Sequence, residues 1–222
     1  MPPERVLETR PGKIIGAGLN YADHVREAGH EIPSEPFVFA KLSSTLIGDG
    51  DPIEINRRIT RRVDWEVELA VVVGRSMRNV PPERALDHVS GYTVANDVSA
   101  RDLQATTELV LAKGLDSFCP LGPVLVPAAE IDDPQRLAIR TRVNGETMQD
   151  SSTAEMIFSV ADLLAHCSRL FTWEPGDVLL TGTPAGCGEF MTPPVSLRDG
   201  DLVEVEIDGI GTLRNPVVEV GS

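Results

Sequence analysis

The segment that most constrains this 222-residue chain is RRVDWEVELAVVVGR, residues 61–75. Its apolar run from Leu69 to Val73 is typical of a buried strand, yet Glu66 and Glu68 come just before it. Side chains two apart on a strand point to the same face, which places these carboxylates roughly 7 Å apart. Because burial strengthens the repulsion between like charges, we expect either a cation between them or a strand end in water.

Strand patterns dominate the rest of the chain. They cover residues 66–74, 91–95 and 121–127, a hairpin with its turn at Asn144-Gly145, and an alternating strand over 203–208. Helical patterns are few and cover 20–29, 82–89, 98–113 and 154–170. Because helices do not alternate regularly with strands, a doubly wound parallel sheet is not expected. We predict a mainly β fold with flanking helices (α+β), arranged as a mixed roll.

Composition narrows the classes of partner. Lys and Arg number 20 against 34 Asp and Glu, a net charge of −14, which argues against nucleic acid and anionic membranes. No apolar run approaches the ~20 residues of a membrane span, and the first residues lack the apolar core of a signal peptide. Three widely spaced cysteines give neither a disulfide framework nor a zinc motif. We therefore expect a cytoplasmic protein that uses local cations or a metal to hold a small anionic substrate.

A third carboxylate follows the next expected strand. In GYTVANDVSARDLQ, residues 91–104, the strand ends near Ala95 and Asp97 comes two residues later. Asp97 can therefore join Glu66 and Glu68 from a neighbouring strand end. Three carboxylates without histidine or cysteine beside them describe a site for Mg²⁺ or Mn²⁺.

Simpler interpretations of the same residues remain open. Glu66 and Glu68 can face water at an exposed strand end, or they can pair with Arg61, Arg62 or Arg75. Asp97 can act only as the N-cap of a following helix.

Two residues of NYADHVREAG also suggest chemistry. His24 and Glu27 are three apart on a short expected helix, so they share a face. A carboxylate beside an imidazole fixes its tautomer and stabilises the imidazolium, which suits a general base that acts on water. An ordinary exposed helix pair is the alternative.

Further polar residues are candidate substrate contacts. Arg101 and Gln104 lie four and seven residues after Asp97, on one side of the expected helix. Lys113, in LAKGLD, can hold a substrate anion or only neutralise nearby acids. Lys41, in FVFAKLSS, is a candidate carboxylate holder near the mouth of the site.

Two threonines flank a glycine in LLTGTPAGCG. The hydroxyl of Thr181 or Thr183 in such a turn can donate to an oxyanion. Alternatively, both threonines only cap the backbone.

Several blocks of the chain resemble a known family. VDWEVELAVVVGR, GYTVANDVSARDLQ, LAKGLDSFCPLGP, RVNGETMQDSSTAEMIF and PGDVLLTGTPAGCG resemble successive signature blocks of the fumarylacetoacetate hydrolase family. NYADHVREAG resembles the start of its short single-domain members. The resemblance runs from about residue 13 to the C-terminus. It implies one catalytic domain over 1–222, the mixed β-sandwich roll of the family's C-terminal domain, and a homodimer.

The resemblance also implies roles for individual residues. A divalent cation, Mg²⁺ or Mn²⁺, would be bound by Glu66, Glu68 and Asp97. The N-terminal segment 1–55 would carry a lid helix, about residues 20–29. The implied roles of the other residues are a water-activating dyad (His24, Glu27), an active-site lysine (Lys113), an oxyanion donor (Thr183) and substrate contacts (Gln104, Arg101, Lys41).

One departure from the larger hydrolases narrows the activity. Those enzymes add an aspartate ligand from an N-terminal loop, and Asn20 stands near that position here. The resemblance therefore favours the short members over a fumarylacetoacetate hydrolase.

The leading functional hypothesis is metal-dependent chemistry on a small 2-oxo or 2,4-dioxo carboxylate. Hydrolysis of an acylpyruvate and decarboxylation of oxaloacetate both pass through a pyruvate enolate that a cation stabilises. The family's alternatives are 2-hydroxyhepta-2,4-diene-1,7-dioate isomerase and 5-carboxymethyl-2-oxo-hex-3-ene-1,7-dioate decarboxylase, both of aromatic catabolism. A non-enzymatic acidic binding protein is the remaining alternative.

Overall fold

The computed structural model describes residues 10–104 and 109–221. Its strands are β1 (Ile14–Gly18), β2 (Phe37–Lys41), β3 (Leu46–Ile47), β4 (Ile53–Asn56), β5 (Val63–Asp64), β6 (Val67–Val73), β7 (Val89–Asn96), β8 (Ser99–Ala100), β9 (Cys119–Pro127), β10 (Ala138–Val143), β11 (Glu146–Ser152), β12 (Val178–Leu180), β13 (Leu202–Ile207) and β14 (Gly211–Val220). The α-helices are α1 (Ala22–Glu27), α2 (Pro82–Ala85), α3 (Leu109–Lys113) and α4 (Val160–Leu170). Single 3₁₀ turns are η1 (Ser43–Thr45), η2 (Leu86–His88), η3 (Arg101–Leu103), η4 (Ala128–Glu130), η5 (Thr153–Glu155) and η6 (Gly188–Phe190).

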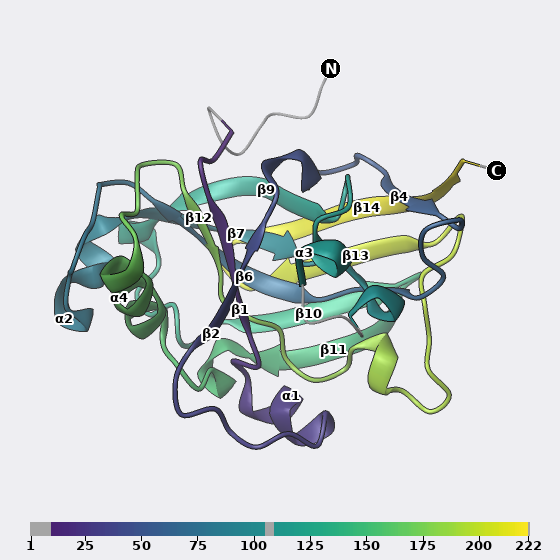
Figure 1. Cartoon of the computed structure of the whole chain (residues 1–222), viewed down its shortest axis with the longest axis horizontal. Helices are drawn as coiled ribbons and strands as arrows, with labels where there is room; N and C mark the ends of the chain where they lie inside the picture. Colours follow the sequence, from purple (N-terminus) through teal and green to yellow (C-terminus); the bar gives the residue numbers. More distant parts are fainter. Residues whose placement is uncertain (1–9, 105–108, 222) are drawn as a thin grey trace.

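Two sheets pack face to face. The seven-stranded sheet has the order β2-β1-β12-β6-β7-β9-β3, and the five-stranded sheet has the order β11-β10-β13-β14-β4. Strands β6 and β7 of the first sheet contact β10, β13 and β14 of the second (Figure 1). Pairing is mostly antiparallel, but β1 lies parallel to β12. The predicted mainly β fold with mixed sheets is confirmed.

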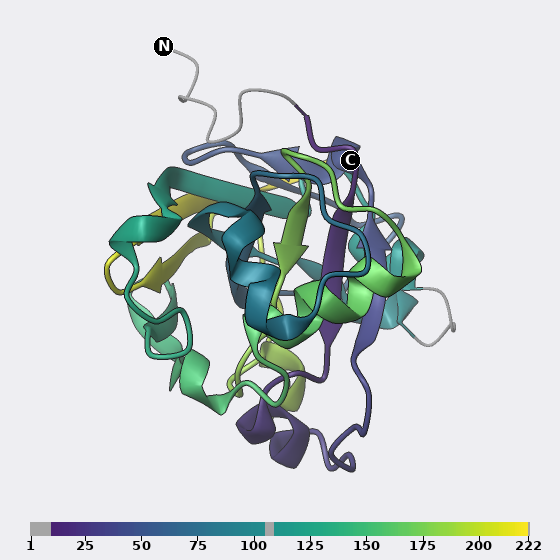
Figure 2. The ribbon, with the colours of Figure 1, turned by 90° about the vertical axis from the view of Figure 1, so that its left-hand side faces the viewer.

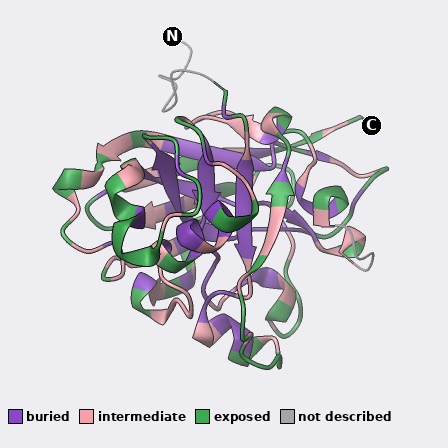
Figure 3. Ribbon diagram, turned by 60° about the vertical axis from the view of Figure 1, so that its left-hand side comes forward, coloured by how far each residue is buried: buried purple, intermediate pink, exposed green. Residues whose placement is uncertain are grey.

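Strand β6 occupies the middle of the structure, and every residue in it is buried. Leu69, Val71 and Val73 belong to the main core between the sheets, while Ala70 and Val72 face a smaller apolar cluster on the opposite side. Apolar side chains therefore pack against both faces of the strand from Leu69 to Val73, which explains the unbroken apolar run there. Figure 3 shows that the buried residues gather in these central strands.

The helices lie outside the sheets. Helices α2 and α4 contact one another and cover one end of the seven-stranded sheet (Figure 2). Helix α1 lies apart from them, beyond the ends of β1 and β2 (Figure 1). No helix in the described part of the chain is both long enough and apolar enough to cross a membrane.

The predicted helix over 98–113 is wrong in its first half. Strand β8 forms there and pairs with β5, and the N–H of Arg101 donates to Arg62 O at 2.7 Å. Pairing with a distant strand therefore overrides the local helical pattern. Strand β8 is followed by η3, and α3 forms in the second half, while residues 105–108 lie outside the described residues.

Two other predicted helices are shorter than expected. Helix α4 begins at Val160 because Ser159 and Asp162 form a capping box that fixes its first turn. The pattern over 82–89 becomes α2 followed by η2. The hairpin turn at Asn144-Gly145 is confirmed, with both residues at positive φ.

Candidate functional site

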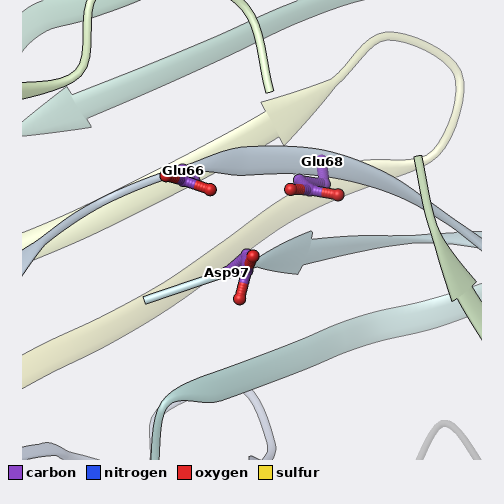
Figure 4. A group of neighbouring side chains, drawn as sticks. All are labelled: Glu66, Glu68 and Asp97. Carbon is purple, nitrogen blue, oxygen red and sulfur yellow. The ribbon is translucent and has the colours of Figure 1, made fainter. Parts of the chain in front are cut away.

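Three carboxylates meet where β6 begins and β7 ends. Asp97 N–H donates to Glu66 O at 2.8 Å, which places the ends of the two antiparallel strands side by side. Glu66, Glu68 and Asp97 each offer one oxygen, and these oxygens lie within 4.8 Å of one another (Figure 4). All three residues are buried. The carboxylate trio is therefore an interior site, not a solvent-exposed strand end, and Asp97 does not precede a helix.

Cations surround two members of the trio. Lys113 Nζ lies 2.8 Å from Glu66 Oε2 and 2.5 Å from Asp97 Oδ2. Arg101 Nη1 lies 2.7 Å from Glu66 Oε1. Burial by itself raises the pKa of Glu66, but the charges of Lys113 and Arg101 outweigh it and lower the pKa to about 2.

Glu68 has a different environment on the same face of the strand. Its Oε2 accepts the N–H of Gly182 at 2.6 Å, but within residues 10–104 and 109–221 no lysine or arginine forms an ion pair with it. Burial raises the pKa of Glu68, and the charges of Asp97 and Glu66 raise it further. Burial therefore makes the charged form of this carboxylate costly unless a further positive charge lies beside it.

The trio fits a hard divalent cation. It offers only oxygen ligands, which Mg²⁺ and Mn²⁺ prefer, and the Glu68 charge lacks a counter-ion. The buried network holds four carboxylates and three cations: Asp64, Glu66, Glu68, Asp97, Lys41, Arg101 and Lys113. A divalent cation would change its formal charge from one negative to one positive, which favours an anionic ligand.

A cavity of about 250 Å³ opens onto this network. Many predicted site residues line it: His24, Glu66, Glu68, Arg101, Gln104, Lys113 and Thr183. Several other residues that line the cavity were not predicted from the sequence: Leu19, His30, Phe37, Phe39, Leu109 and Phe190. The cavity therefore combines a charged part with an apolar part.

Arg101 has one side-chain donor without a partner among the described residues. Its Nε lies 2.8 Å from Asp64 Oδ2, and its Nη1 contacts Glu66 and, at 3.3 Å, Gln104 Oε1. Its Nη2 is buried and has no hydrogen-bond partner among the described residues. Burial alone would lower the pKa of Arg101, but the Glu66 and Asp64 charges raise it. The guanidinium stays charged, and Nη2 is available to bind an anion.

The two lysines occupy different depths. Lys113 lines the cavity; burial alone would lower its pKa, but Asp97 and Glu66 raise it above the usual value. The Lys41 side chain is fully buried, and its Nζ donates to Asp97 Oδ1 and to Lys113 O, both at 2.5 Å. We expected Lys41 near the mouth, but β2 runs inward, and Lys41 instead lies behind Asp97, outside the described lining of the cavity.

Helix α1 brings His24 to the cavity wall. His24 Nδ1 lies 3.5 Å from Glu27 Oε2 and has no hydrogen-bond partner in the described chain. Both Glu27 oxygens accept the N–H of Gly186, at 3.0 and 3.1 Å. The imidazole packs edge-on against Phe190, with ring centroids 5.4 Å apart. The predicted pair is adjacent, and Glu27 also anchors α1 to the loop after β12.

Thr183 is oriented by a residue that the sequence analysis missed. Fully buried Gln149 donates from Nε2 to Thr183 Oγ1 at 2.9 Å and to Pro184 O at 2.8 Å. Its Oε1 accepts from Val67 N at 3.1 Å and Thr141 Oγ1 at 2.7 Å. Because Thr183 Oγ1 accepts from Gln149, its own proton is free to point into the cavity. The only sequence signal was an amide in the middle of a strand, since its partners are distant in sequence.

Two other polar residues near the cavity bond to the backbone. Asn20 donates to Thr181 O at 2.8 Å and to Phe158 O at 3.0 Å. The Thr181 hydroxyl donates to Leu69 O at 2.8 Å. Of the two threonines in the turn, only Thr183 lines the cavity.

Comparisons with known proteins agree with this geometry. The family model described as fumarylacetoacetate (FAA) hydrolase C-terminal matches residues 13–218. The mitochondrial oxaloacetate tautomerase fahd2 of Xenopus laevis is 50% identical over 213 residues, which are 95% of this chain and 66% of that protein. The chain therefore spans about two thirds of that relative's length.

Solved structures show the same fold. A 5-carboxymethyl-2-hydroxymuconate delta-isomerase from Mycobacterium smegmatis has a TM-score of 0.86 and 41% identity, over 98% of this chain and 83% of that chain. Fumarylpyruvate hydrolase from Pseudomonas aeruginosa, in complex with Mn²⁺ and pyruvate, has a TM-score of 0.86 and 31% identity, over 95% of this chain and 91% of that chain. These neighbours include isomerase and hydrolase chemistry on one scaffold.

Proposed function

The chain belongs to the fumarylacetoacetate hydrolase family, and on that premise we propose that it is a metal-dependent enzyme that interconverts the keto and enol forms of oxaloacetate. The observation that carries the proposal is the buried Glu68 carboxylate, without a counter-ion among the described residues, beside a small cavity that Arg101 also lines. The relative named oxaloacetate tautomerase supports the choice of reaction.

The carboxylate trio would hold the metal. Glu66, Glu68 and Asp97 supply its oxygen ligands, and a bound Mg²⁺ or Mn²⁺ would polarise the 2-oxo group of the substrate. The complex of the Pseudomonas aeruginosa hydrolase with Mn²⁺ and pyruvate supports this class of ion and ligand.

Arg101 and Gln104 would orient the substrate. Arg101 lines the cavity and its buried Nη2 has no partner in the described chain, so a small shift of the side chain would let Nη2 bind a substrate carboxylate through a charge-assisted hydrogen bond. Gln104 lies beside it, 3.3 Å from Nη1. A dianion such as oxaloacetate has one carboxylate for this contact and another beside the 2-oxo group.

His24 would move the proton. It would take a proton from C3, and the electrons of that C–H bond would form the C2–C3 double bond while negative charge develops on the 2-oxo oxygen. The Thr183 hydroxyl would donate a hydrogen bond to this oxygen, and the positive charge of Lys113 would stabilise it. The three N–H groups of Lys113 already donate to Glu66, Asp97 and Ser99, and its raised pKa keeps it protonated. Transfer of the proton held by His24 to this oxygen, through a water molecule, would complete the enol with no net gain or loss of atoms.

The test is the rate at which enol oxaloacetate reaches equilibrium with the keto form, followed by absorbance. The purified protein with Mg²⁺ or Mn²⁺ should accelerate this approach, and a chelator should abolish the acceleration. A rate equal to that of buffer with either metal would refute the proposal. Pyruvate release in the same mixtures would measure decarboxylation separately.

A second candidate is hydrolysis of an acylpyruvate into pyruvate and a carboxylic acid. The separation of 3.5 Å between His24 Nδ1 and Glu27 Oε2 favours it, because a modest shift of either side chain would make the water-activating pair. The cavity and carboxylate trio would serve the same roles. Pyruvate formed from an acylpyruvate, in amounts equal to the acid released, would support this reaction.

The dienedioate isomerase and decarboxylase reactions remain alternatives that use the same proton transfer. The Mycobacterium smegmatis isomerase structure supports their inclusion in a substrate panel. The homodimer and the cytoplasmic location remain predictions, and the mass of the protein in solution would test the first.

A further inference from the structure

Two phenylalanines of β2 lie across two glycines of β1. In the antiparallel register, Phe39 faces Gly16 and Phe37 faces Gly18. A Cβ on Gly16 would lie 2.4 Å from Phe39 Cζ, and a Cβ on Gly18 would lie 2.6 Å from Phe37 Cδ1. Cβ atoms do not approach other carbons so closely, because such contacts are strongly repulsive. The absence of side chains on β1 therefore permits both rings to occupy these positions.

Both rings line the cavity described above. Phe39 lies near the charged part, with its ring centroid 5.0 Å from Lys113 Nζ. Phe37 is 49% exposed, so it marks the side that opens to solvent. Leu19 and Leu109 extend the same apolar part. We call the two phenylalanines the aromatic wall.

The proposed function fixes the direction of the substrate. Its first carboxylate and 2-oxo group would lie at the carboxylate trio, and the second carboxylate of oxaloacetate would lie at Arg101. A straight chain without that second carboxylate would instead extend toward the apolar part. The cavity volume of about 250 Å³ is below the ~300–1,000 Å³ typical of pockets for drug-sized ligands. We therefore expect a longer chain to contact the aromatic wall.

We propose that Phe37 and Phe39, held across Gly18 and Gly16, are specificity-determining residues that limit the length of the 2-oxo acid this protein accepts. The inference rests on the proposed function for the orientation of the substrate. The wall offers no charge, so it would tolerate a short apolar extension better than a charged one.

The experiment measures binding, so that it does not depend on turnover. Unreactive straight-chain 2-oxo acids of four to seven carbons would be titrated into the full chain with Mg²⁺ by calorimetry. In wild type, Kd should rise by about tenfold or more at the length that meets the wall, which is the scale of one methylene in a hydrophobic pocket. Phe37→Ala and Phe39→Ala should each lower the ratio of the Kd for the long acid to that for the short acid by about tenfold.

Matched variants separate the wall from general effects. Leu111→Ala removes a 50% exposed side chain of α3 that does not line the cavity, and it should leave the ratio unchanged. Removal of the Phe39 ring also changes the surroundings of Lys113. If that change weakens the binding of both acids equally, it does not alter the ratio of their Kd values. Gly18→Ala should lower Tm in wild type but have little effect in the Phe37→Ala background, where the ring it would strike is gone.

The outcomes are distinct. An unchanged ratio in both phenylalanine variants, with normal binding of the four-carbon acid, would overturn the aromatic wall and leave the proposed function standing. Failure of every acid to bind wild type with Mg²⁺ or Mn²⁺ would refute the proposed function and the wall with it.

Discussion

The carboxylate trio at the floor of the cavity and the α1 side of the cavity are built in different ways. The floor comes from the ends of β6 and β7, two paired strands in the middle of a sheet, and its Glu66 has ion pairs to both Arg101 and Lys113. The α1 side comes from a helix of six residues, in which His24 Nδ1 and Glu27 Oε2 are 3.5 Å apart without a hydrogen bond.

The difference lies in how far each part depends on its neighbours. Outside its own turn, α1 is held by side-chain contacts such as Asp23 to Ser151 at 2.6 Å and Glu27 to Gly186. Regions with few buried contacts open at lower free energy than core strands. We infer that the floor determines which ion and acid group bind, while the α1 side determines which proton moves.

The largest effect should come from removing the unpaired charge of the floor. Glu68→Gln should lower metal-dependent turnover by roughly a thousandfold, the scale of several kcal/mol of transition-state stabilisation. It should also abolish the rise in Tm that Mg²⁺ causes. In the presence of a chelator, the variant should be more stable than wild type, because it removes a buried carboxylate without a counter-ion. A full Mg²⁺-dependent rise in Tm in this variant would contradict the floor as described.

The same residue predicts a pH dependence for the chelated protein. The pKa of Glu68 in the folded state lies above the unfolded value near 4.5, so its contribution to stability is present below that pH and is lost as pH rises through the raised pKa. The pKa of Glu66 is lowered to about 2, so its contribution is present above about 4.5 and is lost as pH falls toward 2. Thermal unfolding across pH should show Glu68→Gln losing only the decline at higher pH. Superimposable curves for variant and wild type would disprove this assignment.

A substitution in α1 should leave metal binding by the floor unchanged. His24→Gln should lower tautomerisation by roughly a hundredfold, as expected for loss of a general base, while the Mg²⁺-dependent rise in Tm stays normal. Steady-state rates and thermal shifts on the same preparations measure both. If metal binding fell together with turnover, the floor and the α1 side would not have the separate functions inferred above.

Arg101 sharpens the description of the floor. Arg101→Lys keeps the positive charge but loses the fork that contacts Asp64 and Glu66 and that carries the unpartnered Nη2. KM for oxaloacetate should rise about tenfold, the lower end of the loss of one hydrogen bond to a charged group. Arg26→Lys is the matched control, because Arg26 pairs with Glu155 on the exposed surface. Equal KM values for the two variants would remove Arg101 from the substrate contacts.

The smallest effect on tautomerisation is expected at Glu27, and it distinguishes the two candidate reactions. Glu27→Gln keeps an oxygen that can accept the N–H of Gly186 but removes the negative charge beside His24. Tautomerisation should change by less than about threefold, whereas hydrolysis that uses the pair should fall by roughly a hundredfold. Parallel assays of both substrates decide between them. A large loss of tautomerisation would assign Glu27 to the chemistry of both.

The sequence predicted the parts of this site that depend on local periodicity. Alternation along a strand placed Glu66 and Glu68 on one face, and the end of the next strand brought Asp97 beside them. The Asn144-Gly145 turn was predictable because both residues tolerate positive φ.

Contacts between distant segments were not predictable in the same way. Strand β8 forms where a helix was expected. Its partner β5 is more than thirty residues away, so no local pattern indicates the pairing. Lys41 reaches Asp97 across 56 positions, and Gln149 reaches Val67 across 82. No periodic pattern reports such pairings, so the depth of Lys41 and the function of Gln149 required the folded structure.

Gln149 has a practical consequence for protein engineering. Its amide bonds both Val67, between two residues of the carboxylate trio, and Thr183, so any replacement there disturbs two components at once. A mutant library that aims at new substrates should therefore keep position 149 fixed, together with His24 and Lys41, and diversify the other positions of β2 and α1. Those elements reach the cavity without carrying an acidic group of the trio.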